Sequence, residues 1–187
     1  MNTFWIWQKK LESMGSDTLA IKDMAGLLTP QSTKELVSLL TKNISIPIHV
    51  HSHATAGLAS LNLIAAVEAG ATIIDTCNSS FSEGASHPTT ESIIAALQSM
   101  GYEINIDIAA IESISEHLRE VRKKYWQFES EFTGVDPRVL SNQVPGGMIS
   151  NLSNQLKDQN ALEKMNDVLK EIPLVRQDLG FPPLVTP

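Results

Sequence analysis

Three histidines, His49, His51 and His53, fall within five residues of one another. Together with Ile48 and Val50 they form the period-two pattern that predicts a buried β-strand. Because every second side chain of a strand points to the same face, the three imidazoles should share one face. Two such imidazoles can bind a metal ion from a rigid element, although histidines that only hydrogen-bond to their neighbours would give the same pattern.

A lysine, Lys22, ends another short apolar stretch, for which we predict a strand over residues 18–21. An unpaired ammonium group is costly to bury, and Asp23 is a poor partner because it points to the opposite face. A lysine that has reacted with CO₂ becomes a carbamate, which is an oxygen ligand rather than a cation. On a strand adjacent to the histidines, such a carbamate would complete a three-ligand metal site with the His-x-His pair.

The histidine strand and the Lys22 strand belong to a repeating pattern of strands and helices. We predict helices over residues 3–14, 31–41, 57–68 and 89–99, and a third strand over residues 71–77. Such repeats are typical of βα units that build a parallel sheet. Three strands are too few for a closed barrel, so they form either a small doubly wound sheet or the last part of a barrel. In both cases a site would lie at the carboxyl ends of the strands.

The chain changes character after residue 107, where the pattern becomes helical throughout. Helices are predicted over residues 108–128, 136–142, 150–157 and 161–172, with a turn at 143–148 and an extended, proline-rich tail at 180–187. A basic cluster near the end of the first of these helices comprises Arg119, Arg122, Lys123 and Lys124. We predict that this cluster is a solvated helix face rather than an anion-binding site.

The composition excludes several classes of function. With 14 basic and 21 acidic residues among 187, the chain has a net charge of −7, which argues against nucleic acid as a partner. The single cysteine, Cys77, excludes an internal disulfide and suits a reducing cytoplasm; its apolar surroundings favour core packing over a role as nucleophile. No apolar run approaches the roughly 20 residues that span a bilayer, and no secretory signal is recognisable. We therefore predict a cytoplasmic protein.

Three other polar residues lie near the predicted strand ends. Asp23 and Asp75 are either groups that support a metal ligand or simply polar residues at the ends of strands, and the sequence does not separate these alternatives. His87 lies in the loop after the third predicted strand, where a site residue could fall. For His87 the simpler prediction is a solvated loop histidine.

Four motifs, in order along the chain, resemble the carboxyltransferase domain of biotin-dependent enzymes. They are found at residues 21–30, 49–57, 143–148 and 182–187. The family comprises pyruvate carboxylase, the oxaloacetate decarboxylase α subunit and the transcarboxylase 5S subunit. Pyruvate carboxylases usually carry Asp-Thr after the last histidine, whereas Ala54 and Thr55 stand here. This difference, together with residues 79–92, favours the oxaloacetate decarboxylase α subunit; the carboxyltransferase subunit of a pyruvate carboxylase is the alternative.

The resemblance implies a fold and a set of site residues. The fold is α/β, with the last three βα units of a TIM (β/α)₈ barrel over residues 1–100 and a helical funnel over residues 101–187. Lys22, as a carbamate, and the histidines His51 and His53 are the implied metal ligands, and His49 is a structural neighbour. Thr186, in the Val-Thr-Pro motif, is the implied catalytic residue that meets biotin and carries a proton between biotin and the pyruvate enolate.

The chemistry that the resemblance implies is the transfer of a carboxyl group between oxaloacetate and biotin, with pyruvate as the product. A divalent metal (zinc, manganese or cobalt) would polarise the keto oxygen and stabilise the enolate. Biotin would arrive on a carrier domain or subunit. The implied partners also include membrane decarboxylase subunits, which would place the protein at the inner membrane, and further copies of the protein in a homo-oligomer.

The match covers only part of the family's pattern. The chain contains what would be strands six to eight of the barrel, and it lacks the first-strand aspartate ligand, the arginine and glutamine that hold the keto acid, and a biotinyl domain. We therefore expect a C-terminal fragment of a carboxyltransferase. A catalytically inactive module that only associates with other subunits is the alternative.

Overall fold

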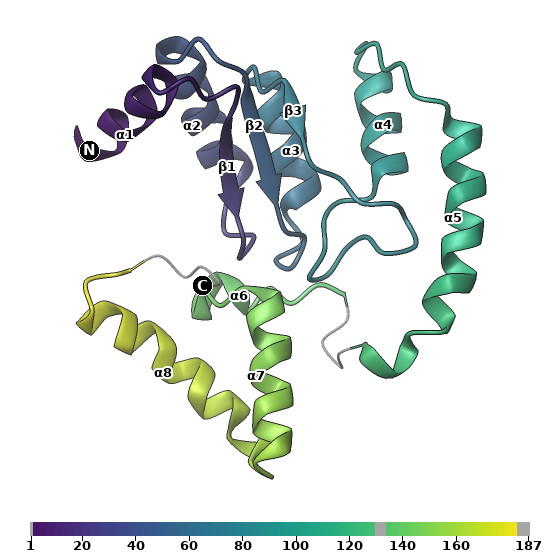
Figure 1. Ribbon diagram of the computed structural model, residues 1–187. Helices are drawn as coiled ribbons and strands as arrows, with labels where there is room; N and C mark the ends of the chain where they lie inside the picture. Colours follow the sequence, from purple (N-terminus) through teal and green to yellow (C-terminus); the bar gives the residue numbers. More distant parts are fainter. Residues whose placement is uncertain (1, 130–133, 183–187) are drawn as a thin grey trace.

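The computed structural model describes residues 2–129 and 134–182 and shows two parts (Figure 1). The first part contains a parallel sheet in the order β1-β2-β3. Its strands are β1 (Leu19–Asp23), β2 (Ile48–Ser52) and β3 (Ile73–Ile74). Its helices are α1 (Asn2–Ser13), α2 (Pro30–Asn43), α3 (Ala59–Glu68) and α4 (Thr90–Ser99).

One face of the sheet forms the main core. Ile48 and Val50 of β2 are buried against Val37 and Leu40 of α2 and Leu63 of α3, and all five belong to one apolar cluster. Along β2 these buried residues alternate with the half-buried His49 and His51, as the period-two pattern predicts. The helices therefore cover one face, and the histidines lie on the other.

The helix α2 begins where the sequence provides a cap. Thr29 accepts a hydrogen bond from the Ser32 backbone N–H, and the Ser32 hydroxyl in turn accepts one from the Thr29 N–H (2.9 Å). Pro30 occupies the first turn, where its missing N–H costs nothing. This start fixes the turn between β1 and α2, which lies at the carboxyl end of the sheet.

The second part is entirely helical. Its elements are α5 (Ile108–Lys123), the 3₁₀ helix η1 (Trp126–Phe128), α6 (Val139–Asn142), α7 (Gly146–Asp158), the 3₁₀ helix η2 (Leu162–Lys164) and α8 (Met165–Asp178). Helices α7 and α8 enclose a small core with Val144, Ile149, Met165 and Leu169. Figure 1 shows α6 and the beginning of α7 below the carboxyl ends of the strands. There Val139 packs against Ala25 and Ala56, so the helical part lies over the end of the sheet where a site is expected.

Several predicted boundaries were wrong. The third strand is confined to two residues, whereas residues 71–77 were predicted, because only Ile73 and Ile74 align with the β2 ladder. The long helix ends at Lys123 and is followed by a 3₁₀ turn. The predicted turn at 143–148 is shorter, since α7 already begins at Gly146. Helix α8 continues past residue 172 to Asp178, although Pro173 within it removes one N–H donor.

Among the described residues, no helix is both long enough and apolar enough to cross a lipid bilayer.

Candidate metal centre

The sheet register places Lys22 beside the histidines. Lys22 of β1 pairs with His51 of β2, and Ala20 pairs with His49. Paired residues of adjacent parallel strands point to the same face, so Lys22 and His51 share the face that the helices leave uncovered. Lys22 is exposed there, and no described carboxylate forms an ion pair with it. The predicted neighbourhood of Lys22 and the His-x-His pair is therefore present.

His51 and His53 point their Nε2 atoms toward each other at a distance of 3.3 Å. Nδ1 of His51 lies 2.6 Å from the carboxylate of Asp75, and Nδ1 of His53 lies 2.6 Å from the Ala85 carbonyl. A carboxylate and a carbonyl can only accept, so both Nδ1 atoms carry the proton. In the neutral rings, both Nε2 atoms then present lone pairs to the same point in space.

Burial favours the neutral form of His53. Desolvation lowers the pKa of His53, and the neighbouring charges of His87 and His51 add to this effect, which outweighs the hydrogen bond to Ala85 that acts in the opposite direction. Neutral imidazole is the form that binds metal ions. His53 is therefore held in the protonation state of a ligand.

The spacing of the two nitrogens fits one shared metal ion. Zinc binds imidazole nitrogen at about 2.0–2.1 Å, so two ligands in a tetrahedral arrangement lie about 3.3–3.4 Å apart. The observed separation of 3.3 Å agrees with this value. A metal-binding histidine typically donates its other N–H to a carboxylate or carbonyl, as both rings do here. The residues thus fit a divalent metal ion.

Asp75 supports this pair from the residue that follows β3. Its two oxygens contact Nε2 of His49 (2.7 Å) and Nδ1 of His51 (2.6 Å). Partial burial opposes ionisation of Asp75, but the hydrogen bonds from His51 and His49 outweigh it and lower the pKa of the carboxyl group. His49 engages Asp75 through its Nε2 atom, and its structural role stays a prediction.

Asp23 serves the backbone rather than the histidines. Its carboxylate accepts hydrogen bonds from the N–H groups of Leu27 (2.9 Å) and Leu28 (3.0 Å) and from the Ser52 hydroxyl (3.0 Å). Its own carbonyl accepts from the His53 N–H (3.1 Å). Asp23 therefore ties the turn after β1 to the end of β2 and fixes the backbone from which His53 projects.

His87 differs from its prediction as a solvated loop residue. The structure places it half-buried, with its ring centroid 4.3 Å from that of His51 and 4.5 Å from that of His53. The preceding loop residue Ala85 also contributes the carbonyl that orients His53. The sequence places His87 in a loop near the predicted site, but only the path of that loop in the fold brings its ring beside His51 and His53.

A polar network anchors this loop to α5. The Ser80 hydroxyl donates to the Ser115 carbonyl (2.7 Å), and the Ser115 hydroxyl donates to Glu91 (2.7 Å). The Glu91 carboxylate also accepts from the Ser79 N–H (3.1 Å). Arg122 donates to the Ser80 carbonyl (2.7 Å). The network joins residues 78–80, at the start of the loop, to helices α4 and α5.

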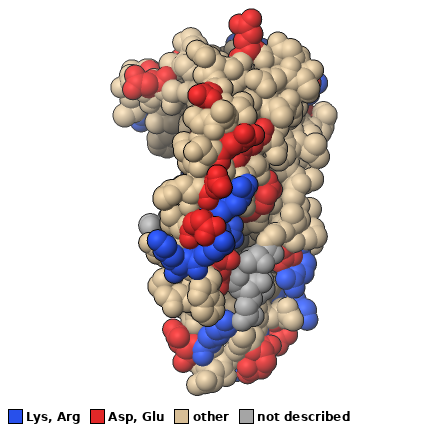
Figure 2. All heavy atoms as spheres, turned by 90° about the vertical axis from the view of Figure 1, so that its right-hand side faces the viewer, with Lys and Arg blue, Asp and Glu red and all other residues tan. Residues whose placement is uncertain are grey.

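The basic cluster on α5 is only partly the solvated face that was predicted. Arg122 pairs with Glu129 (2.6 Å) while also holding the loop, and Arg119 donates to the Ser79 hydroxyl (3.3 Å). Lys123 forms an exposed pair with Glu120 (2.6 Å). Figure 2 shows that basic and acidic side chains are interspersed on this side of the molecule.

Replacing Glu91 with glutamine should destabilise the protein at pH 7 by about 1–2 kcal/mol, because a charged acceptor of several hydrogen bonds is lost. Burial opposes ionisation of Glu91, but hydrogen bonds from Ser115 and Ser79 outweigh it and lower the pKa of the carboxyl group. The stabilisation is therefore present above the unfolded pKa of about 4.3 and disappears as the pH falls through the lower folded pKa.

Urea unfolding between pH 7 and pH 3 measures this effect. The difference between wild type and Glu91→Gln should shrink below about pH 5. Glu112→Gln, an exposed change on helix α5, which also carries Ser115, should shift stability by less than about 0.5 kcal/mol throughout. A difference that grew on acidification would contradict the expectation.

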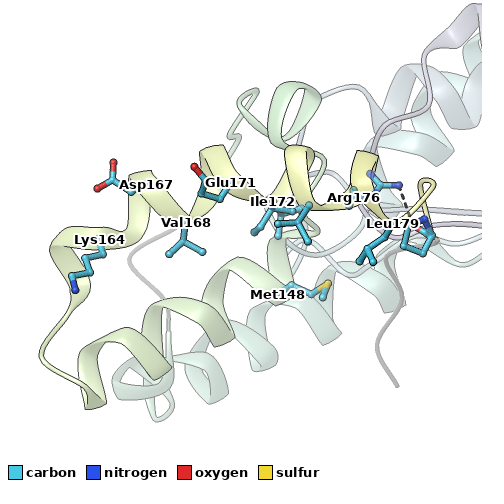
Figure 3. Close-up of a pocket in the computed structure, with 11 residues that line it drawn as sticks. Met148, Lys164, Asp167, Val168, Glu171, Ile172, Arg176 and Leu179 are labelled. Carbon is cyan, nitrogen blue, oxygen red and sulfur yellow. Dashed lines mark hydrogen bonds between the residues drawn. The ribbon is translucent and has the colours of Figure 1, made fainter.

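Of the remaining candidates, Thr186 lies outside the described residues, and Cys77 is half-buried beside the loop after β3. The chain leading toward Thr186 is fixed at Arg176, which donates to Gln143 and to the Pro182 carbonyl (3.3 Å). Pro182 also lines an apolar groove of about 650 Å³ between α7 and α8. Figure 3 shows Val168 and Ile172 of α8 pointing toward α7. No described metal-site residue lines this groove.

Comparison with known proteins places the two parts of the chain in two family models. Residues 5–118 match the HMGL-like family, and residues 139–187 match the conserved carboxylase domain. A pyruvate carboxylase subunit of Methanocaldococcus jannaschii is 52% identical over 180 residues, which cover 96% of this chain and 32% of that protein. The methylmalonyl-CoA carboxyltransferase 5S subunit of Propionibacterium freudenreichii is 42% identical over 180 residues, covering 95% of this chain and 35% of that protein.

Solved structures agree with these matches. The carboxyl transferase domain of Rhizobium etli pyruvate carboxylase, determined with pyruvate, superposes with a TM-score of 0.93 at 34% identity, over 98% of this chain and 31% of that chain. The predicted fold, the last βα units of a TIM-type barrel followed by a helical region, is confirmed. The chain spans about a third of the length of these relatives. It belongs to the HMGL-like family and represents part of a carboxyltransferase domain of the biotin-dependent carboxylases.

Proposed function

We propose that the chain carries the metal-binding part of a site that transfers a carboxyl group between biotin and a 2-oxo acid, with pyruvate and oxaloacetate as the pair of substrates. The observation that carries the proposal is the approach of His51 and His53, whose Nε2 atoms lie 3.3 Å apart at the carboxyl end of β2. Further support comes from the similarity to a pyruvate carboxylase subunit and to a carboxyl transferase domain determined with pyruvate.

The described residues have defined tasks in this proposal. His51 and His53 hold a divalent metal ion, for which zinc, manganese and cobalt are the candidates, and Asp75 and the Ala85 carbonyl orient the two rings. When bound, the metal supplies a Lewis acid that polarises the keto oxygen and stabilises the negative charge of the enolate. Lys22, beside His51 in the register, adds an oxygen ligand as a carbamate.

Thr186 completes the proposal through its resemblance to the family motif. Its hydroxyl moves a proton between the biotin ring nitrogen and the enolate carbon, which converts the enolate to pyruvate. Biotin reaches the site on a carrier domain or subunit, and the complete protein acts as a homo-oligomer.

The relatives support the carboxyltransferase subunit of a pyruvate carboxylase over the oxaloacetate decarboxylase α subunit that the sequence motifs favoured. Oxaloacetate decarboxylase stays the second candidate because Ala54 and Thr55 follow the histidines, where pyruvate carboxylases usually carry Asp-Thr. Membrane decarboxylase subunits are partners only in this second case. Carboxylation of pyruvate in the presence of a biotin carboxylase and ATP distinguishes the two, since a decarboxylase complex has no ATP-dependent partner.

The release of pyruvate from oxaloacetate by the purified protein that contains this chain, measured with and without free biotin, tests the proposal. We expect biotin to stimulate pyruvate release, and Thr186→Ala to remove the stimulation while leaving the metal content unchanged. Thr186→Ser keeps the hydroxyl and should retain activity. If the rate of pyruvate release does not change when biotin is added and equals the rate given by dissolved metal alone, the proposal is overturned in favour of a non-catalytic association module.

A further inference from the structure

Arg176 lies in the last turn of α8 and bonds two segments outside that helix. Its guanidinium donates one hydrogen bond to the side-chain oxygen of Gln143 and one to the Pro182 carbonyl (3.3 Å). Figure 3 shows Arg176 at the end of α8, where a dashed line marks one of its hydrogen bonds. A basic side chain that only capped α8 would bond the last carbonyls of that helix. Arg176 instead joins the turn after α6 to the segment that follows α8.

The end of α8 turns the chain back toward Arg176. Gly180, in the left-handed region at φ +75°, donates its N–H to the Gln177 carbonyl (3.0 Å), and the Phe181 N–H donates to the Arg176 carbonyl (2.7 Å). These two bonds form a Schellman motif. Phe181 also has a left-handed φ of +57°, so the chain reverses over two successive residues. The Pro182 carbonyl thereby comes within reach of the Arg176 guanidinium.

Apolar packing contributes little to holding this turn. Leu179 and Phe181, on either side of Gly180, are 69% and 62% exposed. The left-handed backbone of Phe181 is itself unfavourable for a residue with a side chain. Among the residues that the structure describes, Arg176 supplies the only side-chain hydrogen bond to this end of the chain. The guanidinium is therefore the group that fixes Pro182.

Gln143 connects the guanidinium to the carboxyl end of the sheet. It ends α6 in the left-handed region at φ +59°, with its N–H bonded to the Val139 carbonyl (2.7 Å). Val139 is fully buried and packs against Ala25 and Ala56 beside the strand ends. The backbone of Gln143 is thus held from the same end of the sheet that carries His51 and His53.

We infer that Arg176 is a positioning residue for the carboxyl transfer, because its bonds to Gln143 and Pro182 set where the Val-Thr-Pro segment starts relative to the metal centre. The inference rests on the proposed function, in which the Thr186 hydroxyl moves the proton. Thr186 follows Pro182 by four residues, and four extended residues span at most about 14 Å. A fixed Pro182 restricts the positions from which this hydroxyl meets the enolate carbon. A misplacement of about 1 Å can cost about 100-fold in rate.

An arginine suits this task better than other residue types. A guanidinium presents five N–H donors in one rigid plane, so it holds two acceptors from different segments at a fixed spacing. The Nε atom of Arg176 is buried, and within the described part of the chain it has no hydrogen-bond partner. The side chain is therefore held through its two terminal nitrogens. A lysine ammonium on a flexible stem reaches either acceptor without fixing the spacing between them.

Steady-state kinetics of the purified protein that contains this chain tests the inference. Arg176→Met should lower kcat for biotin-stimulated pyruvate release by at least about tenfold, while KM for oxaloacetate and the metal content change by less than about twofold. Arg176→Lys should give an intermediate kcat. Lys170→Met, which removes an exposed cation from the same helix, should match the wild type. A kcat of Arg176→Met equal to that of the wild type, or a loss of metal in this variant, would overturn the inference.

The bond to Gln143 supplies a second comparison. Gln143→Leu removes the acceptor and should lower kcat by at least about fivefold, and the double variant should lose no more than Arg176→Met alone, because both changes break the same link. Gln143→Glu keeps an acceptor and should keep kcat. Losses that multiply in the double variant would contradict a shared role.

Hydrogen exchange measured by mass spectrometry follows the segment without relying on activity. In Arg176→Met the peptide of residues 177–187 should exchange at least about tenfold faster than in the wild type, whereas the α7 peptide and the Lys170→Met variant should be unchanged. Unchanged exchange in Arg176→Met would overturn the inference even if kcat fell. A wild type without biotin-stimulated release would overturn the proposed function and the inference together. An active wild type with an equally active Arg176→Met would overturn the inference alone.

Discussion

Replacing His53 with alanine is expected to weaken Zn²⁺ binding by at least about 100-fold, because it removes a ligand rather than a group that merely orients one. The Nε2 atoms of His53 and His51 lie 3.3 Å apart, so removal of either ring leaves the other without the partner that defines the site. His51→Ala should have an effect of the same size. Competition with a chromophoric chelator measures both affinities.

His49→Ala is the matched control for these two variants. His49 lies on the same strand and the same face, but its Nε2 atom is engaged by Asp75 at 2.7 Å. Its removal deletes one of the two imidazole contacts of Asp75 and leaves the contact with His51 in place. We therefore expect less than about a tenfold loss of Zn²⁺ affinity. Circular dichroism shows whether each variant keeps its fold. Equal losses in His49→Ala and His53→Ala would contradict the assignment of ligands.

The alternation of residues in the sequence was sufficient to predict the sheet. Ile48 and Val50 had to face apolar helices, and this requirement put His49 and His51 on the other face whatever the rest of the fold was. The parallel direction of the strands followed from the repeated βα units, whereas their order β1-β2-β3 agrees with the barrel that the family resemblance implied. The pairing of Lys22 with His51 is a consequence of the same geometry.

The parts of the site that were not predicted depend on loops. His87 reaches His51 only because the chain between β3 and α4 returns to the strand end, and no periodicity in the sequence encodes such a path. The Ala85 carbonyl that orients His53 is a backbone group, which the residue type does not reveal. Arg122 could be identified as basic, yet its bond to the Ser80 carbonyl depends on how α5 packs. Thr186 stays a prediction that rests on its motif.

Replacing Gly26 with alanine is expected to destabilise the protein and weaken metal binding at the same time. Gly26 has φ +68°, which is unfavourable for any residue with a side chain by about 1–2 kcal/mol. A Cβ atom at this position would also lie 2.6 Å from the His53 carbonyl oxygen, a backbone atom that cannot rotate away. The turn is fixed by the bonds from Leu27 and Leu28 to Asp23, so the collision must displace His53.

Gly15→Ala separates the two effects. Gly15 has φ +88°, and a Cβ atom there would meet nothing within 4 Å, so this variant carries the backbone cost alone. Urea unfolding in the presence of EDTA, which removes the contribution of bound metal, should show that Gly26→Ala loses about 1–3 kcal/mol more than Gly15→Ala. Zinc affinity should fall about tenfold in Gly26→Ala, as after loss of a group that orients a ligand, and stay unchanged in Gly15→Ala. Equal behaviour of the two variants would show that the turn after β1 does not control the position of His53.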